Sequence, residues 1–219
     1  MSLPPTAILT DIEGTTTPIA FVHKVLFPYA RARLPAFVAA HPRIAETPTP
    51  ALETLFAQMD RDEKDPVLKT IQGMIWEQGY LAGDLKAEIY PDVAPALRRW
   101  SKAGLRLFVY SSGSAAAQKL LFGHNAAGDL TPLFQAFFDT GVGPKREAAS
   151  YAAISRGANI PPPEFLFLSD IEAELDAAAQ AGLRTCQLLR PEDGTKPSQR
   201  HETARDFAQV AEKFGLPRG

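Results

Sequence analysis

The sequence predicts an α/β fold in which a doubly wound parallel sheet carries an inserted helical segment. Strand-like runs alternate with helical patterns from residue 90 to the C-terminus, which is typical of βαβ units. One further strand-like run lies near the N-terminus and ends at an acidic residue. The stretch between them has helical periodicity and shows no convincing strand. We therefore expect a core domain of residues 1–18 and 90–219, interrupted by an all-helical domain of residues 19–89.

The first strand is expected at Thr6–Thr10, an apolar, β-compatible run that ends at Asp11. A run of this kind is typical of a buried strand in a parallel sheet. The segment after it repeats apolar residues at three- and four-residue spacing, which predicts amphipathic helices. Proline and small polar residues at 41–50 and 62–66 divide this segment into separate helices. The apolar positions that carry the spacing are Phe21, Val25, Leu26, Tyr29, Leu52, Leu55 and Phe56.

Beyond the turn-forming residues 90–92, helices and strands are expected in strict alternation. The strands are predicted at 105–112, 135–140, 165–170 and 183–189. The helices are predicted at 93–104, 115–123, 146–158, 172–182 and 201–214. Residues 191–201 are rich in turn formers and are expected to be a loop.

Composition narrows the class of function. The chain has 219 residues, of which 45% are hydrophobic and 22% charged, which is typical of a globular enzyme. A formal net charge of -2 provides no overall attraction for nucleic acid or anionic lipid, so we expect a small-molecule ligand held by a local site. The sequence has no basic leader and no run of 18 apolar residues, and a cytoplasmic location without membrane contact is the expectation.

Cysteine and histidine usage makes a zinc centre an unfavourable interpretation. The single cysteine, Cys186, excludes a disulfide within the chain and is expected to be a buried thiol in a strand. No two histidines have the helical spacing of a metal site, so core or surface roles are expected for His23, His41, His124 and His201.

Polar residues follow the predicted strands at the points where the strands end. In a parallel sheet these carboxyl ends meet at one edge, where ligands bind. They carry Asp11 and Glu13, the serines and glycine of SSGS, Asp139, Ser169 and Asp170. A further candidate, Lys145, follows the turn GVGPK and is expected to begin the next helix. Carboxylates, hydroxyls and lysine are the groups that bind metal ions and phosphate, so we expect Asp11, Ser111, Lys145 and Asp170 to converge on one pocket.

Each candidate also has a purely structural interpretation. Asp11 and Glu13 would serve as a helix cap or as turn acids, and the SSGS stretch as a turn or as the cap of the helix that follows it. Asp170 would equally cap the next helix. A cap and a phosphate ligand are compatible, however, because free backbone amides at a helix start attract anions. Lys145 alone would be an ordinary solvated surface lysine.

Together these residues resemble the four motifs of the haloacid-dehalogenase-like superfamily, in their usual order and over nearly the whole chain. The resemblance implies a Rossmann-like core with an inserted cap domain. Most phosphatases of that superfamily carry aspartate two positions after the nucleophile, whereas this sequence has Glu13 there. That replacement is similar to the enolase-phosphatase family of methionine salvage, as are DIEGTTTPI, LFPYA, YSSGSAAAQKLLFGH, GPKREAASY and FLSDIEAELDAA.

The resemblance implies phosphoryl transfer through Asp11, whose carboxylate would attack phosphorus and form an aspartyl phosphate. Mg²⁺ held by Asp11, Glu13 and Asp170 would offset the repulsion between nucleophile and phosphate. Lys145 would neutralise the remaining charge. The phosphate oxygens would be held by the hydroxyl and backbone amides of Ser111, Ser112 and Gly113.

Glu13 would protonate the leaving oxygen and later help a water molecule attack the aspartyl phosphate. The sequence leaves open whether Glu13 binds magnesium through its side chain or its backbone carbonyl. It also leaves open which group accepts the proton during enolisation, for which Glu13 is our hypothesis.

The substrate implied by the resemblance is 2,3-diketo-5-methylthiopentyl-1-phosphate, converted through an enol phosphate to the acireductone 1,2-dihydroxy-3-keto-5-methylthiopentene and phosphate. A methylthio tail needs an apolar pocket, and the inserted helices offer Phe21, Leu26, Met74 and Trp76 as lining. At His23 the sequence departs from the pattern of that family. Because His23 is expected on a helix of the inserted domain, the departure concerns local contacts of that domain and not the phosphate chemistry. We expect a monomer.

Three alternative functions remain open at the level of sequence. The nearest is a general magnesium-dependent phosphatase of the same superfamily that acts on another small organic phosphate. A dehalogenase would need no metal ion. A binding protein that retains the fold without turnover is disfavoured by the complete set of acids, hydroxyls and lysine.

Overall fold

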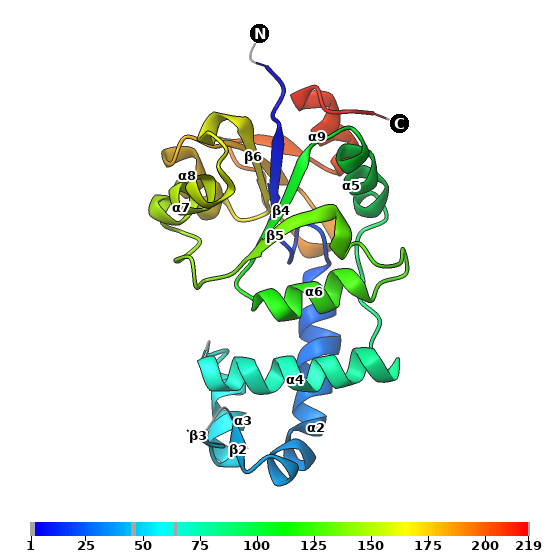
Figure 1. Ribbon diagram of the computed structural model, residues 1–219, viewed down its shortest axis with the longest axis vertical. Helices are drawn as coiled ribbons and strands as arrows, with labels where there is room; N and C mark the ends of the chain where they lie inside the picture. The colour runs from blue at the N-terminus through cyan, green and yellow to red at the C-terminus, as the bar shows by residue number, and fades with distance from the viewer. Residues whose placement is uncertain (1–2, 45–46, 64, 219) are drawn as a thin grey trace.

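A six-stranded parallel sheet forms the centre of the larger body of the computed structural model, which describes residues 3–44, 47–63 and 65–218 (Figure 1). Its strand order is β5-β4-β1-β6-β7-β8, with β1 paired to β4 on one side and β6 on the other. The predicted doubly wound α/β fold is therefore confirmed. The strands are β1 (Ala7–Thr10), β4 (Arg106–Tyr110), β5 (Phe134–Phe138), β6 (Phe165–Ser169), β7 (Arg184–Leu188) and β8 (Glu202–Ala204).

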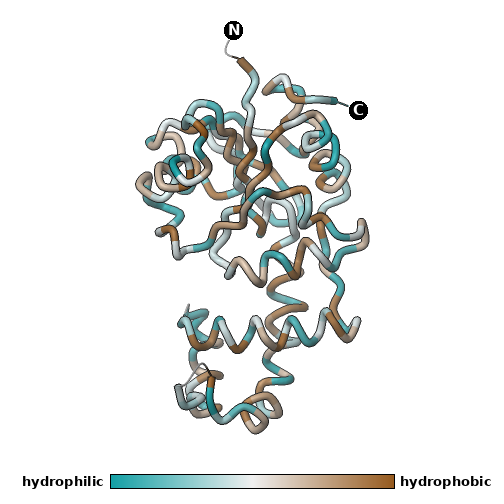
Figure 2. Tube along the Cα trace, in the orientation of Figure 1, coloured by the Kyte–Doolittle hydropathy of each residue, from teal (hydrophilic) through white to brown (hydrophobic). Residues whose placement is uncertain are grey.

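Helices cover both faces of the sheet because its strands are apolar on both sides (Figures 1 and 2). Successive side chains of a strand point to opposite faces. Ile8 accordingly packs with side chains of α5 and α9, whereas its neighbour Leu9 packs with side chains of α7 and α8. The helices are α5 (Val93–Lys102), α6 (Ala115–Gly123), α7 (Ala148–Ala158), α8 (Glu172–Gln180) and α9 (Phe207–Phe214), with short 3-10 turns at Thr131–Leu133, Pro162–Glu164 and Pro191–Asp193.

The segment inserted after β1 forms a smaller helical body below the sheet in Figure 1. Its helices share an apolar cluster of their own, built from α2, α3 and α4. Asp65 starts α4 by accepting hydrogen bonds from the backbone N–H groups of Val67 and Leu68, both at 2.9 Å. The limits 19–89 of a separate domain stay a prediction. The elements are α1 (Ile19–Phe21), a π-helical turn η1 (Val22–Leu26), α2 (Phe27–Ala40), α3 (Leu52–Asp60) and α4 (Pro66–Ala82).

The expectation that the insertion contains no strand is wrong at one point. Strands β2 (Arg43–Ile44) and β3 (Thr47–Pro48) pair antiparallel between α2 and α3. Two residues per strand are too few to produce the alternating pattern by which a strand is predicted.

The C-terminal helix begins later than the predicted residue 201. Residues Glu202–Ala204 form β8 at the sheet edge, and α9 starts after Asp206, whose carboxylate accepts a hydrogen bond from the Gln209 N–H at 2.7 Å. No glycine or proline separates this short strand from the helix, so the sequence carried no break at the correct place.

Two other expectations can be compared with the structure. Cys186 is buried in β7 as predicted, and burial raises the pKa of its thiol to about 12. Within the ranges that the structure describes, no helix has the length and apolar character needed to cross a membrane.

Candidate active site

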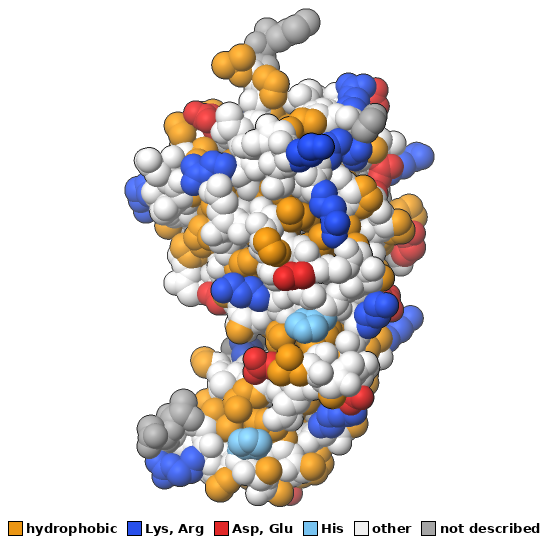
Figure 3. All heavy atoms as spheres, turned by 45° about the vertical axis from the view of Figure 1, so that its right-hand side comes forward, with side chains coloured by type: hydrophobic (Ala, Val, Ile, Leu, Met, Phe, Trp, Pro, Cys, Tyr) orange, Lys and Arg blue, Asp and Glu red, His pale blue; other side chains and the backbone are white. Residues whose placement is uncertain are grey.

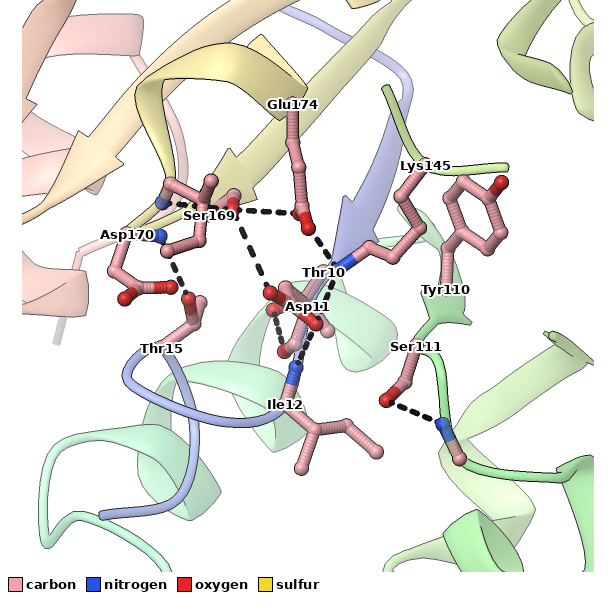
Figure 4. Close-up of polar contacts among 12 residues, drawn as sticks. Thr10, Asp11, Ile12, Thr15, Tyr110, Ser111, Lys145, Ser169, Asp170 and Glu174 are labelled. Carbon is pink, nitrogen blue, oxygen red and sulfur yellow. Dashed lines mark hydrogen bonds and ion pairs between the residues drawn. The ribbon is translucent and has the colours of Figure 1, made fainter. Parts of the chain in front are cut away.

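The candidate site lies at the carboxyl edge of the sheet, where β1, β4 and β6 end side by side (Figure 4). Asp11 follows β1, Ser111 follows β4 and Asp170 follows β6. All three are buried, as is Lys145 from the loop before α7. Lys145 does not begin that helix as expected, because α7 starts at Ala148.

Lys145 joins the nucleophile candidate to a further carboxylate. Its Nζ lies 2.7 Å from Asp11 Oδ1 and 2.6 Å from Oε2 of Glu174, a residue in the first turn of α8. Glu174 Oε2 also accepts a hydrogen bond from the Ser169 hydroxyl at 3.0 Å. Side-chain exposures of 8% for Lys145 and 12% for Glu174 mean that this pairing is largely shielded from water.

Burial and crowding of carboxylates determine the electrostatics of the site. Burial, followed by the negative charge of Asp11, raises the pKa of Asp170 to about 7. The same two causes raise the pKa of Glu174 to about 7, although Lys145 opposes them. Burial alone would lower the pKa of Lys145, but Asp11 and Glu174 outweigh it and raise that pKa above its ordinary value. The site therefore holds more negative than positive groups and favours an added cation.

The loop after β1 is shaped around Asp170. Gly14 has a φ of +68°, a conformation that favours glycine, and a Cβ built there would lie 2.5 Å from Asp170 Oδ2. The Thr15 hydroxyl accepts a hydrogen bond from the Asp170 N–H at 3.0 Å. Arg190, buried behind the loop, donates to the Thr15 carbonyl at 2.7 Å and pairs with Asp92 at 3.0 Å. The loop and Asp170 are thus held at close approach.

The residues present fit a magnesium ion. Asp170 Oδ1 is buried and has no hydrogen-bond partner within the described ranges. Those ranges contain no group of three or more His, Cys, Asp and Glu side chains arranged for a metal ion. Magnesium, however, is usually held by one or two carboxylates with water and substrate phosphate, so two aspartates suffice.

The Ser111–Gly113 stretch turns between β4 and α6. The Gly113 N–H donates to Ser111 Oγ at 3.3 Å, and Gln118 Nε2 holds the Gly113 carbonyl at 2.8 Å. Ser114 caps α6 by accepting from the Ala117 N–H at 3.3 Å. From the inserted body, Lys69 Nζ donates to the Ser112 carbonyl at 2.9 Å. This stretch therefore combines a helix start with a contact to the insertion.

Asp139, at the end of β5, does not join the site carboxylates. Its Oδ2 accepts from the Ala115 N–H at 3.0 Å and its Oδ1 from the Gly141 N–H at 2.8 Å. It supports the start of α6, which is the structural role weighed for strand-end acids.

A cavity of about 320 Å³ lies between the core and the inserted helices, at the level where Figure 3 shows the molecule narrowing. Glu13 and the Ser111–Gly113 stretch line its core side. Of the residues expected to line an apolar pocket, Leu26 and Trp76 do so. Phe21 instead packs in the core, and Met74 packs among the inserted helices.

His23 also lines this cavity, from the π-helical turn. Its ring packs edge-on against Phe27 with centroids 5.5 Å apart. The departure of His23 from the family pattern therefore lies on the cavity wall. It also lies in a π-helical turn, a feature that is frequent at functional sites.

The sequence interpretation missed Glu174. A signal was available, since Glu174 lies four residues after Asp170 and a helix starting there brings such residues to one side. The ion pair between Glu174 and Lys145 could not be predicted, because the two residues are 29 positions apart in the sequence, at 145 and 174.

Comparison with known proteins agrees with this geometry. A family model described as haloacid dehalogenase-like hydrolase matches residues 5–182. Enolase-phosphatase E1 of Granulibacter bethesdensis is 56% identical over an alignment of 227 positions, which covers 98% of each chain. The chain belongs to the enolase-phosphatase E1 family of haloacid dehalogenase-like hydrolases. The predicted family and the predicted phosphatase class of enzyme are confirmed.

Further relatives place this enolase-phosphatase family in the wider fold. Enolase-phosphatase E1 of Acidiphilium cryptum is 55% identical and covers 99% of each chain. The crystal structure of the UTR4 protein from Saccharomyces cerevisiae is 35% identical, with a TM-score of 0.79 over 92% of this chain and 98% of that one. CbbY from Rhodobacter sphaeroides in complex with phosphate, 19% identical with a TM-score of 0.66 over 97% and 100% of the two chains, shows the shared fold alone.

Proposed function

We propose that this chain converts 2,3-diketo-5-methylthiopentyl-1-phosphate, through an enol phosphate, to 1,2-dihydroxy-3-keto-5-methylthiopentene and phosphate. The observation that carries the proposal is the buried Asp11–Lys145 pair at 2.7 Å, placed at the sheet edge where Ser111 also ends a strand. Membership of the enolase-phosphatase E1 family supports the substrate.

Asp11 is the proposed nucleophile. Its Oδ1 is held by Lys145 Nζ at 2.7 Å and by the Ile12 N–H at 2.7 Å, whereas among the described residues Oδ2 meets only the Ser169 hydroxyl, at 3.5 Å. Oδ2 is therefore the oxygen that attacks phosphorus, forming an aspartyl phosphate as the bond to the enol oxygen breaks. Lys145 stabilises the charge that develops on the phosphoryl oxygens.

Asp11 and Asp170 are the residues that would hold magnesium, with Glu13 contributing through its side chain or its backbone carbonyl. When bound, magnesium offsets the repulsion between the Asp11 carboxylate and an anionic phosphate. The orphaned Asp170 Oδ1 and its raised pKa support this assignment, because both describe a carboxylate that lacks a positive partner.

Ser111, with the backbone amides of Ser112 and Gly113, is proposed to bind the phosphate oxygens. Glu13, on the wall of the same cavity, is proposed to give a proton to the leaving oxygen and to accept the proton lost in enolisation. Both roles agree with the position of these residues at the core side of the cavity.

The apolar part of the cavity supports a methylthio tail. Its wall from the insertion includes Leu26, Phe27, Leu68 and Trp76. These four side chains offer an apolar surface to the methylthio group. A monomeric state, a cytoplasmic location and the lack of nucleic-acid or membrane partners stay predictions.

The test is an assay without oxygen, with magnesium, that follows enol absorbance and phosphate release from the diketone phosphate beside a panel of sugar phosphates. We expect the diketone phosphate to be turned over fastest, with an enol signal. Faster release of phosphate from a sugar phosphate, without an enol, would favour the general phosphatase instead.

A further inference from the structure

The face that α4 presents to the cavity carries a buried glutamine among apolar and aromatic side chains. Leu68, Gln72, Trp76 and Tyr80 follow one another at four-residue spacing, which places them on one face of the helix, and all four line the cavity. Gln72 is only 8% exposed. Among the described residues, the side-chain amide of Gln72 has no hydrogen-bond partner.

The missing partner indicates that the contents of the cavity complete the hydrogen bonding of Gln72. A buried amide without a partner costs free energy, so such groups are normally paired with protein, water or ligand. Gln118, across the cavity, already donates from Nε2 to the carbonyls of Gly113 and Phe138, both at 2.8 Å. Gln118 Oε1 has no partner among the described residues, so Gln118 offers only an acceptor, whereas Gln72 offers both a donor and an acceptor to a bound molecule.

We propose that Gln72 binds the enol intermediate through both ends of its amide and thereby favours enolisation. This inference rests on the proposed function. Its Nε2 would donate to the C3 carbonyl, and its Oε1 would accept from the hydroxyl on C2.

The two tautomers of the substrate differ in what they offer this amide. The diketone has adjacent carbonyl acceptors and no donor at C2 or C3, so it pairs with Nε2 alone. Enolisation moves a proton from C1, through the proposed acceptor Glu13, to the C2 oxygen, so that the C1–C2 double bond forms and a hydroxyl stands on C2 beside the C3 carbonyl. That arrangement satisfies both amide ends, and tighter binding of the enol accelerates its formation. Gln72 itself gains and loses no proton.

The experiment compares two substrates on one variant. Gln72→Met retains the side-chain volume but removes both hydrogen-bonding groups. With magnesium and without oxygen, we expect its kcat/KM for the diketone phosphate to fall by about tenfold to a hundredfold, the scale of two lost hydrogen bonds. Phosphate release from 5-methylthiopentyl-1-phosphate, which has the same tail but no carbonyl to enolise, should change by less than about twofold.

Gln78→Met is the matched control, because Gln78 lies on the same helix but is exposed to solvent. It should retain wild-type turnover of both substrates. Equal losses on both substrates by Gln72→Met would overturn the inference, since the glutamine would then support the cavity as a whole. An undiminished enol signal from Gln72→Met would overturn the inference about Gln72 and leave the proposed function standing. A wild-type enzyme that forms no enol from the diketone phosphate would instead overturn the proposed function.

Discussion

The two sides of the cavity differ in how their polar groups are satisfied. At the sheet edge of the core, Lys145 is bound by two carboxylates, and on the core wall of the cavity Gln118 Nε2 donates to two backbone carbonyls. On the insertion side, the wall combines apolar side chains with polar ones, and Gln72 has no hydrogen-bond partner among the residues that the structure describes. The core thus holds its lysine between carboxylates before substrate arrives, whereas on the insertion side a buried amide is left for substrate to complete.

This difference separates the chemistry from the choice of substrate. Phosphoryl transfer needs charged groups held in advance, and the ends of parallel strands provide fixed positions for them. Recognition of the rest of the substrate needs a shaped wall, which the inserted helices supply. Substitutions on the core side should therefore reduce turnover of every phosphate ester, and the following predictions test that expectation.

Asp11→Asn should have the largest effect. The amide cannot attack phosphorus, so phosphate release should fall by at least about 10⁴-fold for every ester tested. Steady-state phosphate assays with the diketone phosphate and a sugar phosphate measure this. Substantial activity toward either ester would remove Asp11 from the nucleophile role.

Lys145→Ala should reduce kcat by about 10²- to 10³-fold, the usual scale for one preorganised electrostatic group. The loss should be similar for all phosphate esters, because Lys145 contacts the proposed nucleophile Asp11 and does not line the cavity wall. Lys102→Ala, at an exposed position of α5, is the control and should match wild type. An unchanged rate for Lys145→Ala at saturating substrate would contradict the proposed role.

Gly14→Ala should impair both stability and magnesium binding. The new Cβ would meet Asp170 Oδ2 at 2.5 Å in a backbone conformation with φ of +68°. Gly83→Ala shares the strain, at φ of +79°, but its Cβ has no atom within 4 Å. Strain alone costs about 1 to 2 kcal/mol. Chemical denaturation should show a larger loss for Gly14→Ala, and calorimetry should show weaker magnesium binding for it alone. Equal behaviour of the two variants would contradict close packing of the loop on Asp170.

Glu174→Gln should change how stability depends on pH in protein freed of metal by a chelator. Glu174 has a pKa of about 7 in the folded chain, above the ordinary value of a glutamate. At a pH between the ordinary pKa of a glutamate and 7, Glu174 keeps its proton in the folded chain but has lost it in the unfolded chain. The free energy of unfolding of the wild type therefore falls as the pH rises toward 7. We expect wild type to lose on the order of 1 to 3 kcal/mol relative to Glu174→Gln between pH 4 and 8. Parallel pH profiles from urea denaturation would contradict the raised pKa.

Much of the fold and part of the site could be predicted from the sequence. Alternation of apolar strands with helical patterns predicted the parallel sheet, because each signal is local and repeats along the chain. The rule that ligands bind at strand ends then selected Asp11, Ser111 and Asp170, which the structure brings to one edge. The short strands β2, β3 and β8 were missed, since two or three residues carry no period.

What the sequence determined by itself is therefore the order of elements and the residue types at each strand end, both of which depend on neighbours along the chain. Tertiary structure alone decided which distant groups pair. Lys145 meets Glu174 because α7 and α8 pack on the same face of the sheet, and Gln72 reaches the cavity because α4 packs near α6. Such contacts join residues far apart in the chain, and their energies come from burial, which exists only after folding.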